Sequence, residues 1–266
     1  MARIHVRNDL NVPASVHSHG LLVPATQDGV PGVSFPGIPP RSVFTCAFPI
    51  RQAATYWYHS HSGLQEQRGV YGSIVIHPRD GERHPTDREQ LVVLSDWTDE
   101  NPNPVAGLLR SGNEWYSIAR NTHQTLWGAL RIGRLGDFLQ REWQSMPDDE
   151  ISDMSYDRFL INGSTAPEFD AQPGETLRLR IINAASATYF YVQFAGGTRT
   201  VVAADGKEVD PFELDRLLVS VAETYDVLVT QPSEGAFEFR ATAWDVGGDV
   251  PLPRLSRPPS RRRINR

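Results

Sequence analysis

Short segments of alternating apolar and polar residues, separated by glycine and proline, constrain the fold of this chain more than any other feature. In residues 176–181, apolar side chains alternate with Thr176, Arg178 and Arg180, and residues 225–229 repeat the pattern. Alternation with a period of two predicts strands with one buried and one exposed face. The 21 glycines and 20 prolines indicate frequent turns. An antiparallel sandwich or barrel is therefore expected.

The strand-rich segments fall into two units. Residues 1–80 form the first, a polar linker follows at 81–89, and residues 90–245 form the second. Good helix formers between 105 and 145 predict a short helical insertion in the second unit. Residues 246–266 are rich in proline and arginine, which predicts a disordered basic tail. We consider a shifted or artificially ended reading frame as one origin of this tail.

Charge and hydropathy exclude several classes of protein. Six arginines lie in residues 251–266, so the remaining chain carries 20 basic against 32 acidic residues. An acidic body argues against binding to nucleic acid. No run approaches the roughly 18–20 apolar residues of a membrane span. The alternating start after Met1 is unlike a signal peptide, so we expect the natural beginning of the chain to be missing.

The single cysteine and the histidines differ in what they predict. Cys46 alternates with Phe44 and Phe48, which predicts a buried core thiol that forms no disulfide within the chain. Four of the eight histidines form two His-x-His pairs, His17 with His19 and His59 with His61. On a strand, the members of such a pair project from one face roughly 6.5–7 Å apart. Each pair is therefore suited to give one ligand to each of two neighbouring ions.

Imidazole ligands alone leave the metal open among copper, zinc, iron and nickel. The wider motifs are more specific, because they resemble the first two domains of multicopper oxidases, and most closely the bacterial copper-resistance subfamily. Ser18 stands where the wider family commonly has tryptophan. The resemblance covers about residues 3–244 and rests on the segments HSHG (17–20), DGVPG (28–32), TYWYHSHSGLQEQ (55–67), LING (160–163), PGETLRLRIIN (173–183), VVAADG (201–206) and AETYD (222–226).

This resemblance implies a fold, a cofactor and a role for each matching residue. The fold would be all-β, with two cupredoxin-like Greek-key domains of the sandwich or barrel type. The cofactor would be copper, in part of the trinuclear cluster that reduces dioxygen to water. By position, His17 is similar to a type 2 copper ligand, and His19, His59 and His61 are similar to type 3 ligands. Asp28 matches an acidic residue that assists proton delivery, although Asp-Gly is also a common turn.

The resemblance also implies that half of the site is absent from this sequence. A type 1 blue copper site needs a thiolate with two imidazoles, and the family holds it, with the other cluster histidines, in a final domain. No histidine follows His123, and Cys46 has no flanking histidine. Dioxygen would therefore be a partner only if another chain completed the cluster. The family further implies a periplasmic location.

Three functional hypotheses remain open from the sequence. The first is the copper-binding portion of an oxidase that acts on cuprous ion or phenol-like donors, inactive by itself. The second is a non-catalytic copper-binding or copper-resistance module that uses the same four histidines. The third is a zinc site with an incomplete ligand set and water, which no hydrolase motif such as HExxH supports.

Overall fold

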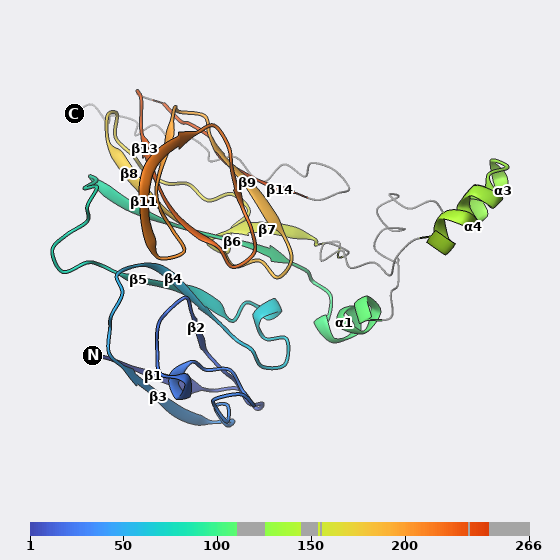
Figure 1. Cartoon of the computed structure of the whole chain (residues 1–266), viewed down its shortest axis with the longest axis horizontal. Coiled ribbons are helices and arrows are strands. Elements are labelled where there is room, and N and C mark those ends of the chain that lie inside the picture. Colours follow the sequence, from blue (N-terminus) through green and yellow to red (C-terminus); the bar gives the residue numbers. More distant parts are fainter. Residues whose placement is uncertain (111–125, 145–153, 155, 234, 245–266) are drawn as a thin grey trace, which may run out of the picture.

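The computed structural model describes residues 1–110, 126–144, 154, 156–233 and 235–244. The predicted basic tail and part of the predicted helical insertion lie outside these residues. Within them, strands dominate, and they assemble into four sheets (Figure 1). The predicted all-β fold class is confirmed. Cys46 is a free, buried thiol, as its alternation with phenylalanines predicts.

The first half of the chain forms two small antiparallel sheets. Strand β1 (Ala2–Asn8) pairs with β3 (Ser42–Phe48) along its whole length. The other sheet has β4 (Ala54–His59) at its centre, between β2 (His17–His19) and β5 (Tyr71–Ile76). Thr55 and three aromatic residues fill the middle of β4, which suits a central strand.

The second half forms a larger sandwich. Strand β6 (Arg88–Trp97) pairs with β8 (Thr176–Asn183) in parallel, and the other pairs described in this half are antiparallel. The six-stranded sheet has the order β11 (Lys207–Leu214), β10 (Arg199–Ala204), β13 (Thr224–Thr230), β8 (Thr176–Asn183), β6 (Arg88–Trp97), β7 (Arg158–Ile161). The three-stranded sheet has the order β12 (Leu217–Val219), β9 (Tyr189–Phe194), β14 (Phe239–Trp244).

A hydrophobic core lies between these two sheets. Ile181 from β8 and Val201 from β10 pack in one cluster with Phe190 from β9 and Ala241 from β14, and all four are fully buried. Strand β6 begins at Arg88, so the last two residues of the predicted linker belong to the sheet. The division of the chain into two independent domains stays a prediction.

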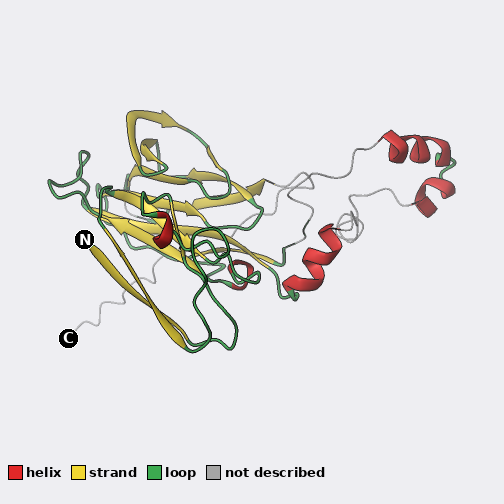
Figure 2. Ribbon diagram, turned by 60° about the horizontal axis from the view of Figure 1, so that its bottom comes forward, coloured by secondary structure: helices red, strands yellow, loops and turns green. Residues whose placement is uncertain are grey.

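The helical insertion follows β6, as predicted, in three described helices. Helix α1 (Pro102–Arg110) lies close to the sheets, whereas α3 (Leu126–Arg131) and α4 (Leu135–Gln144) lie apart from them (Figures 1 and 2). Trp127 on α3 is 74% exposed. None of the described helices combines the length and the apolar character that a membrane crossing requires.

One prediction about β8 is wrong. The alternation predicts that Arg178 and Arg180 lie on an exposed face, but they are only 3% and 2% exposed. Strand β4 of the first half covers this face of β8. The carboxylates of Glu82 and Asp226 bind the guanidinium groups there. Both faces of β8 are therefore buried, one by apolar packing and the other by ion pairs.

Candidate metal centre

Strand pairing brings the two His-x-His pairs together. Strands β2 and β4 run antiparallel, and His17 lies directly opposite His59 in their register. Opposed residues of an antiparallel pair have their side chains on the same face of the sheet, about 5 Å apart at Cβ. Two motifs that are distant in the sequence thus become neighbours through a single strand contact.

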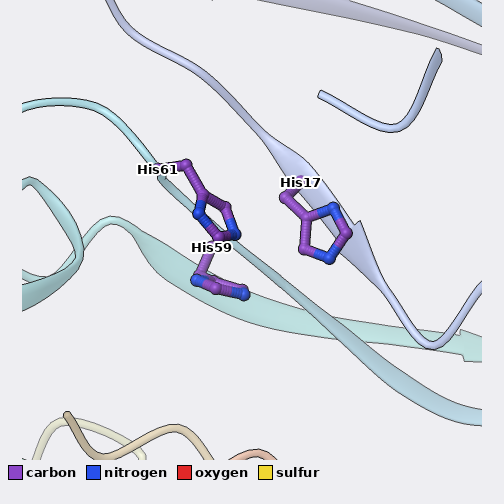
Figure 3. Close-up of side chains that lie close together, drawn as sticks. All are labelled: His17, His59 and His61. Carbon is purple, nitrogen blue, oxygen red and sulfur yellow. The ribbon is translucent and has the colours of Figure 1, made fainter. Parts of the chain in front are cut away.

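Three imidazoles converge on one point. Ligand nitrogens of His17, His59 and His61 all lie within 4.8 Å of one another. The ring centroid of His17 is 5.3 Å from that of His59 and 5.0 Å from that of His61, and the last two rings are 4.7 Å apart. Figure 3 shows the three side chains gathered between β2 and the end of β4. This group takes one histidine from the first pair and both from the second.

His19 lies beside this group. Its ring centroid is 5.4 Å from the rings of both His17 and His59. Its Nδ1 is 3.2 Å from Nε2 of His59, which is hydrogen-bonding distance. All four predicted histidines therefore form one cluster, with three in common ligand range and the fourth adjacent. Their assignment as metal ligands stays a prediction.

His61 lies beyond the strand that the sequence predicts for it, because β4 ends at His59. Side-chain hydrogen bonds hold the segment instead. The backbone N–H of His61 donates to Oγ of Ser15 at 2.9 Å, and the hydroxyl of Ser62 donates to the same oxygen at 3.0 Å. Gln65 accepts from the hydroxyl of Ser60 at 2.9 Å. A polar network thus positions the third imidazole.

Two histidines are oriented by partners on their outer nitrogens. Nδ1 of His17 is 2.8 Å from the carbonyl oxygen of Asp28 and 3.4 Å from its carboxylate. Nδ1 of His59 is 2.8 Å from Oε2 of Glu66. With the protons on Nδ1, each ring offers Nε2 as a ligand, an arrangement common in metal sites. Asp28 thus lies beside the cluster, and its predicted role in proton delivery stays a prediction.

Glu66 and Trp57 are site residues that the sequence reasoning missed. Glu66 lies in a 3-10 turn (Glu66–Arg68) that folds back onto β4. The indole of Trp57 stacks on two imidazoles. Its ring is 4.3 Å from that of His59 at 12°, and 5.0 Å from that of His19 at 28°. The segment 55–67 contains both residues, but only the folded turn and strand reveal these contacts.

Burial keeps part of the cluster uncharged. It lowers the pKa of His19 to about 4, with further contributions from the neighbouring His59 and His17. Burial likewise lowers the pKa of His61, again reinforced by His59 and His17. Neutral imidazole is the form that binds metals. The donor set of imidazole nitrogens, oriented from outside by Asp28 and Glu66, fits copper among the metals that such ligands accept.

A second group of potential ligands has a different environment. His77, Glu82 and Glu89 also lie within 4.8 Å of one another. The guanidinium of Arg180 donates to both carboxylates, at 2.6 Å to Glu82 and 2.7 Å to Glu89. These carboxylates therefore belong to an ion-pair network in which Arg180 already binds both of them.

An all-β fold with a cluster of four histidines is typical of copper-binding cupredoxin proteins, and comparison with known sequences identifies the family. Sequence profiles described as multicopper oxidase match residues 1–81 and 88–251. This chain belongs to the multicopper oxidase family. The resemblance to the copper-resistance subfamily is also confirmed, because the chain is 41% identical to copper resistance protein A of Escherichia coli over 256 residues. That match covers 92% of this chain and 42% of the relative.

A further relative agrees with the family assignment, and solved structures agree with the fold. The chain is 35% identical to the multicopper oxidase MmcO of Mycobacterium tuberculosis, over 90% of this chain and 46% of the relative. The crystal structure of Fet3p, a multicopper oxidase that functions in iron import, superposes with a TM-score of 0.71 at 24% identity, over 93% of this chain and 41% of that one. The laccase of Botrytis aclada gives 0.65 at 26% identity, over 90% and 40% of the two chains. The chain thus spans less than half the length of these proteins.

Proposed function

We propose that this chain is the copper-binding portion of a multicopper oxidase and contributes half of the ligands of a trinuclear cluster. The observation that carries the proposal is the convergence of His17, His59 and His61, with His19 adjacent. Copper, when bound, supplies one-electron redox chemistry towards dioxygen. In this proposal His17 is a type 2 ligand, and the other three histidines are type 3 ligands.

The remaining residues of the site hold and orient these imidazoles. Glu66 accepts the Nδ1 proton of His59, and the Asp28 carbonyl accepts that of His17. The Asp28 carboxylate, 3.4 Å from His17, is suited to pass protons to the cluster edge. Trp57 packs against β8 and is only 1% exposed. It therefore keeps water away from the side of His19 and His59 on which its indole stacks.

A complete reaction needs groups that this sequence does not contain. No histidine follows His123, and no histidine flanks the buried Cys46 in the sequence. In the proposal, another polypeptide segment supplies the remaining cluster ligands and the type 1 site, and dioxygen binds only then. We further propose a periplasmic location, and two domains at 1–80 and 90–245 joined by a linker at 81–89. The profile matches at 1–81 and 88–251 support that division.

Copper stoichiometry tests the ligand assignment. We expect the double substitution His59→Ala and His61→Ala to abolish specific copper uptake, measured by metal analysis after dialysis and by the Cu(II) electron paramagnetic resonance (EPR) spectrum. The matched control is the double substitution of the exposed His5 and His77 by alanine, which should leave uptake unchanged. Equal copper content in both double variants would refute the assignment.

Oxygen consumption separates the oxidase portion from a non-catalytic copper-binding module. We expect the isolated chain, loaded with copper, to show no intense blue absorption and no oxygen uptake with cuprous ion or a phenol. If the chain is a portion of an oxidase, addition of a segment that carries the missing ligands should produce both the blue absorption and the oxygen uptake. If copper binds but no added segment restores turnover, the binding module is the correct function.

A further inference from the structure

A buried carboxylate far from the imidazoles connects the second half of the chain to the strand that carries His59. Both carboxylate oxygens of Asp226, on β13, are engaged. Oδ1 accepts a hydrogen bond from the hydroxyl of Thr55 at 2.6 Å. Oδ2 accepts from Arg178 and from Arg180, each at 2.9 Å. Asp226 and both arginines are almost fully buried.

Thr55 is held from three directions. Besides donating to Asp226, its hydroxyl accepts from Nη1 of Arg180 at 2.9 Å. Its backbone carbonyl accepts from the hydroxyl of Thr224 at 3.2 Å. One residue of β4 therefore has three hydrogen bonds to β8 and β13. We call Thr55, Asp226, Arg178 and Arg180 the clamp.

The clamp lies on the same strand face as the site. Residues 55, 57 and 59 of β4 point to one side, because side chains alternate along a strand. Trp57 packs against Val93, Ile182 and Ala184 of the second half, and its indole stacks on His59. At roughly 3.3 Å per residue, the clamp lies about 13 Å along the strand from His59.

The two kinds of contact constrain β4 differently. The packing of Trp57 is apolar, and apolar contacts have no preferred direction, so they fix how deeply the strand is buried. The hydrogen bonds of the clamp are directional, and they fix the rotation of the strand and its position along its own axis. Of these two contacts with the second half, only the directional one bears on where the imidazole two residues beyond Trp57 points, and it acts together with the hydrogen bond between His59 and Glu66.

We propose that Asp226, acting through Thr55, is a positioning residue of the copper site: the clamp sets the orientation of β4 and thereby that of His59. The proposal rests on the proposed function for the identity of the metal. In this proposal the second half of the chain, which contributes none of the four histidines, helps to orient the imidazole of His59.

Substitution Thr55→Val tests the proposal, because it keeps the shape of the side chain and removes the hydroxyl. We expect Cu(II) affinity to fall about tenfold, the lower end of the loss for contacts outside the ligand shell, and the Cu(II) EPR parameters to change. Thr55→Ser, which keeps the hydroxyl, should restore both. Native affinity and an unchanged spectrum in Thr55→Val would overturn the proposal.

The matched control is Thr188→Val. Thr188 is also buried, and its hydroxyl also donates to a buried carboxylate, that of Asp96 at 2.9 Å, but this pair lies entirely in the second half. We expect Thr188→Val to lower the thermal midpoint without changing copper affinity or spectrum. An equal effect of both substitutions on the copper spectrum would show a general loss of stability, and would also overturn the proposal.

A readout without metal separates this proposal from the proposed function. In the metal-free chain, Thr55→Val should shift the NMR signals of the His59 ring protons, which the Trp57 indole shields, and Thr188→Val should not. If the native chain binds no copper at its histidines, the proposed function fails, while these shifts still decide whether the clamp positions His59. Unchanged His59 signals in Thr55→Val would reject the clamp.

Discussion

At the scale of single residues, the site depends on a close backbone approach as well as on its imidazoles. Gly29 follows Asp28 and has a positive φ of 83°. A Cβ at this position would lie 1.9 Å from the carbonyl oxygen of Val16, the residue before His17. Because glycine has no side chain, the Asp28 turn can lie against β2, where the Asp28 carbonyl accepts a hydrogen bond from His17.

Substitution Gly29→Ala is expected to damage both stability and copper binding. The left-handed conformation alone costs an alanine about 1–2 kcal/mol, and the clash with Val16 must move the Asp28 turn away from His17. Gly32→Ala is the matched control, because Gly32 has φ of 79° and open space around its Cβ position. Chemical unfolding and copper titration should show a larger loss for Gly29→Ala in both quantities. Equal losses would mean that the close approach is unimportant.

The residues of the site differ in how far the sequence predicts them. The spacing of His17, His19, His59 and His61 and the Asp28 turn are visible as motifs, because i and i+2 residues share a strand face. Glu66 is not, since its contact with His59 depends on a 3-10 turn that reverses the chain over seven residues. No local pattern encodes which way such a turn folds back.

At the scale of elements, β4 is the strand on which the site is built. It pairs with β2 on one side and β5 on the other, and it contacts β8 and β13 of the second half. Trp57, near its centre, is 1% exposed and separates the imidazoles from the core of the second half. Among the described residues its indole N–H has no hydrogen-bond partner. Its contribution is therefore packing and stacking.

Two substitutions of Trp57 should differ strongly. Trp57→Ala removes a buried aromatic ring, which costs about 3–5 kcal/mol, and leaves His19 and His59 without their stacking partner. Trp57→Phe retains an aromatic ring and forfeits no hydrogen bond, so we expect a loss of about 1–2 kcal/mol and copper affinity close to native. Trp244→Ala, at a half-exposed tryptophan of β14, controls for the loss of an indole. Weak copper binding by Trp57→Phe would show that the indole has a specific role.

The sequence predicts individual strands better than it predicts which other strands pair with them or cover them. Alternation of apolar residues correctly predicts β8 and β13, because each strand has one face in the core of the sandwich. The same alternation fails for the arginines of β8, since the pattern cannot reveal that a second sheet and its carboxylates cover the polar face. The sequence of neither strand likewise reveals that two distant strands, such as β6 and β8, pair with each other.

At the scale of the whole molecule, the packing of four imidazoles couples the site to global stability. Burial and neighbouring imidazoles lower the pKa of His19 to about 4 and also lower that of His61. Between pH 6.5 and about 4, the unfolded chain therefore binds more protons at these positions than the folded chain does. Stability rises with pH wherever the unfolded state binds more protons. In the metal-free protein, the cluster should thus reduce stability as the pH falls through this window.

The free energy of unfolding of the metal-free chain, measured by urea titration from pH 7 to pH 4, tests this coupling. We expect it to fall more steeply for the native chain than for the double variant His19→Asn and His61→Asn, which cannot titrate at these positions. Burial raises the pKa of Asp96, which acts in the opposite direction, but this contribution is common to both proteins and cancels in the comparison. Parallel curves would show that the imidazoles titrate alike in the folded and unfolded states. Diverging curves, together with an NMR titration midpoint of about 4 for the His19 ring, would establish that the fold holds His19 in its metal-binding form before any metal arrives.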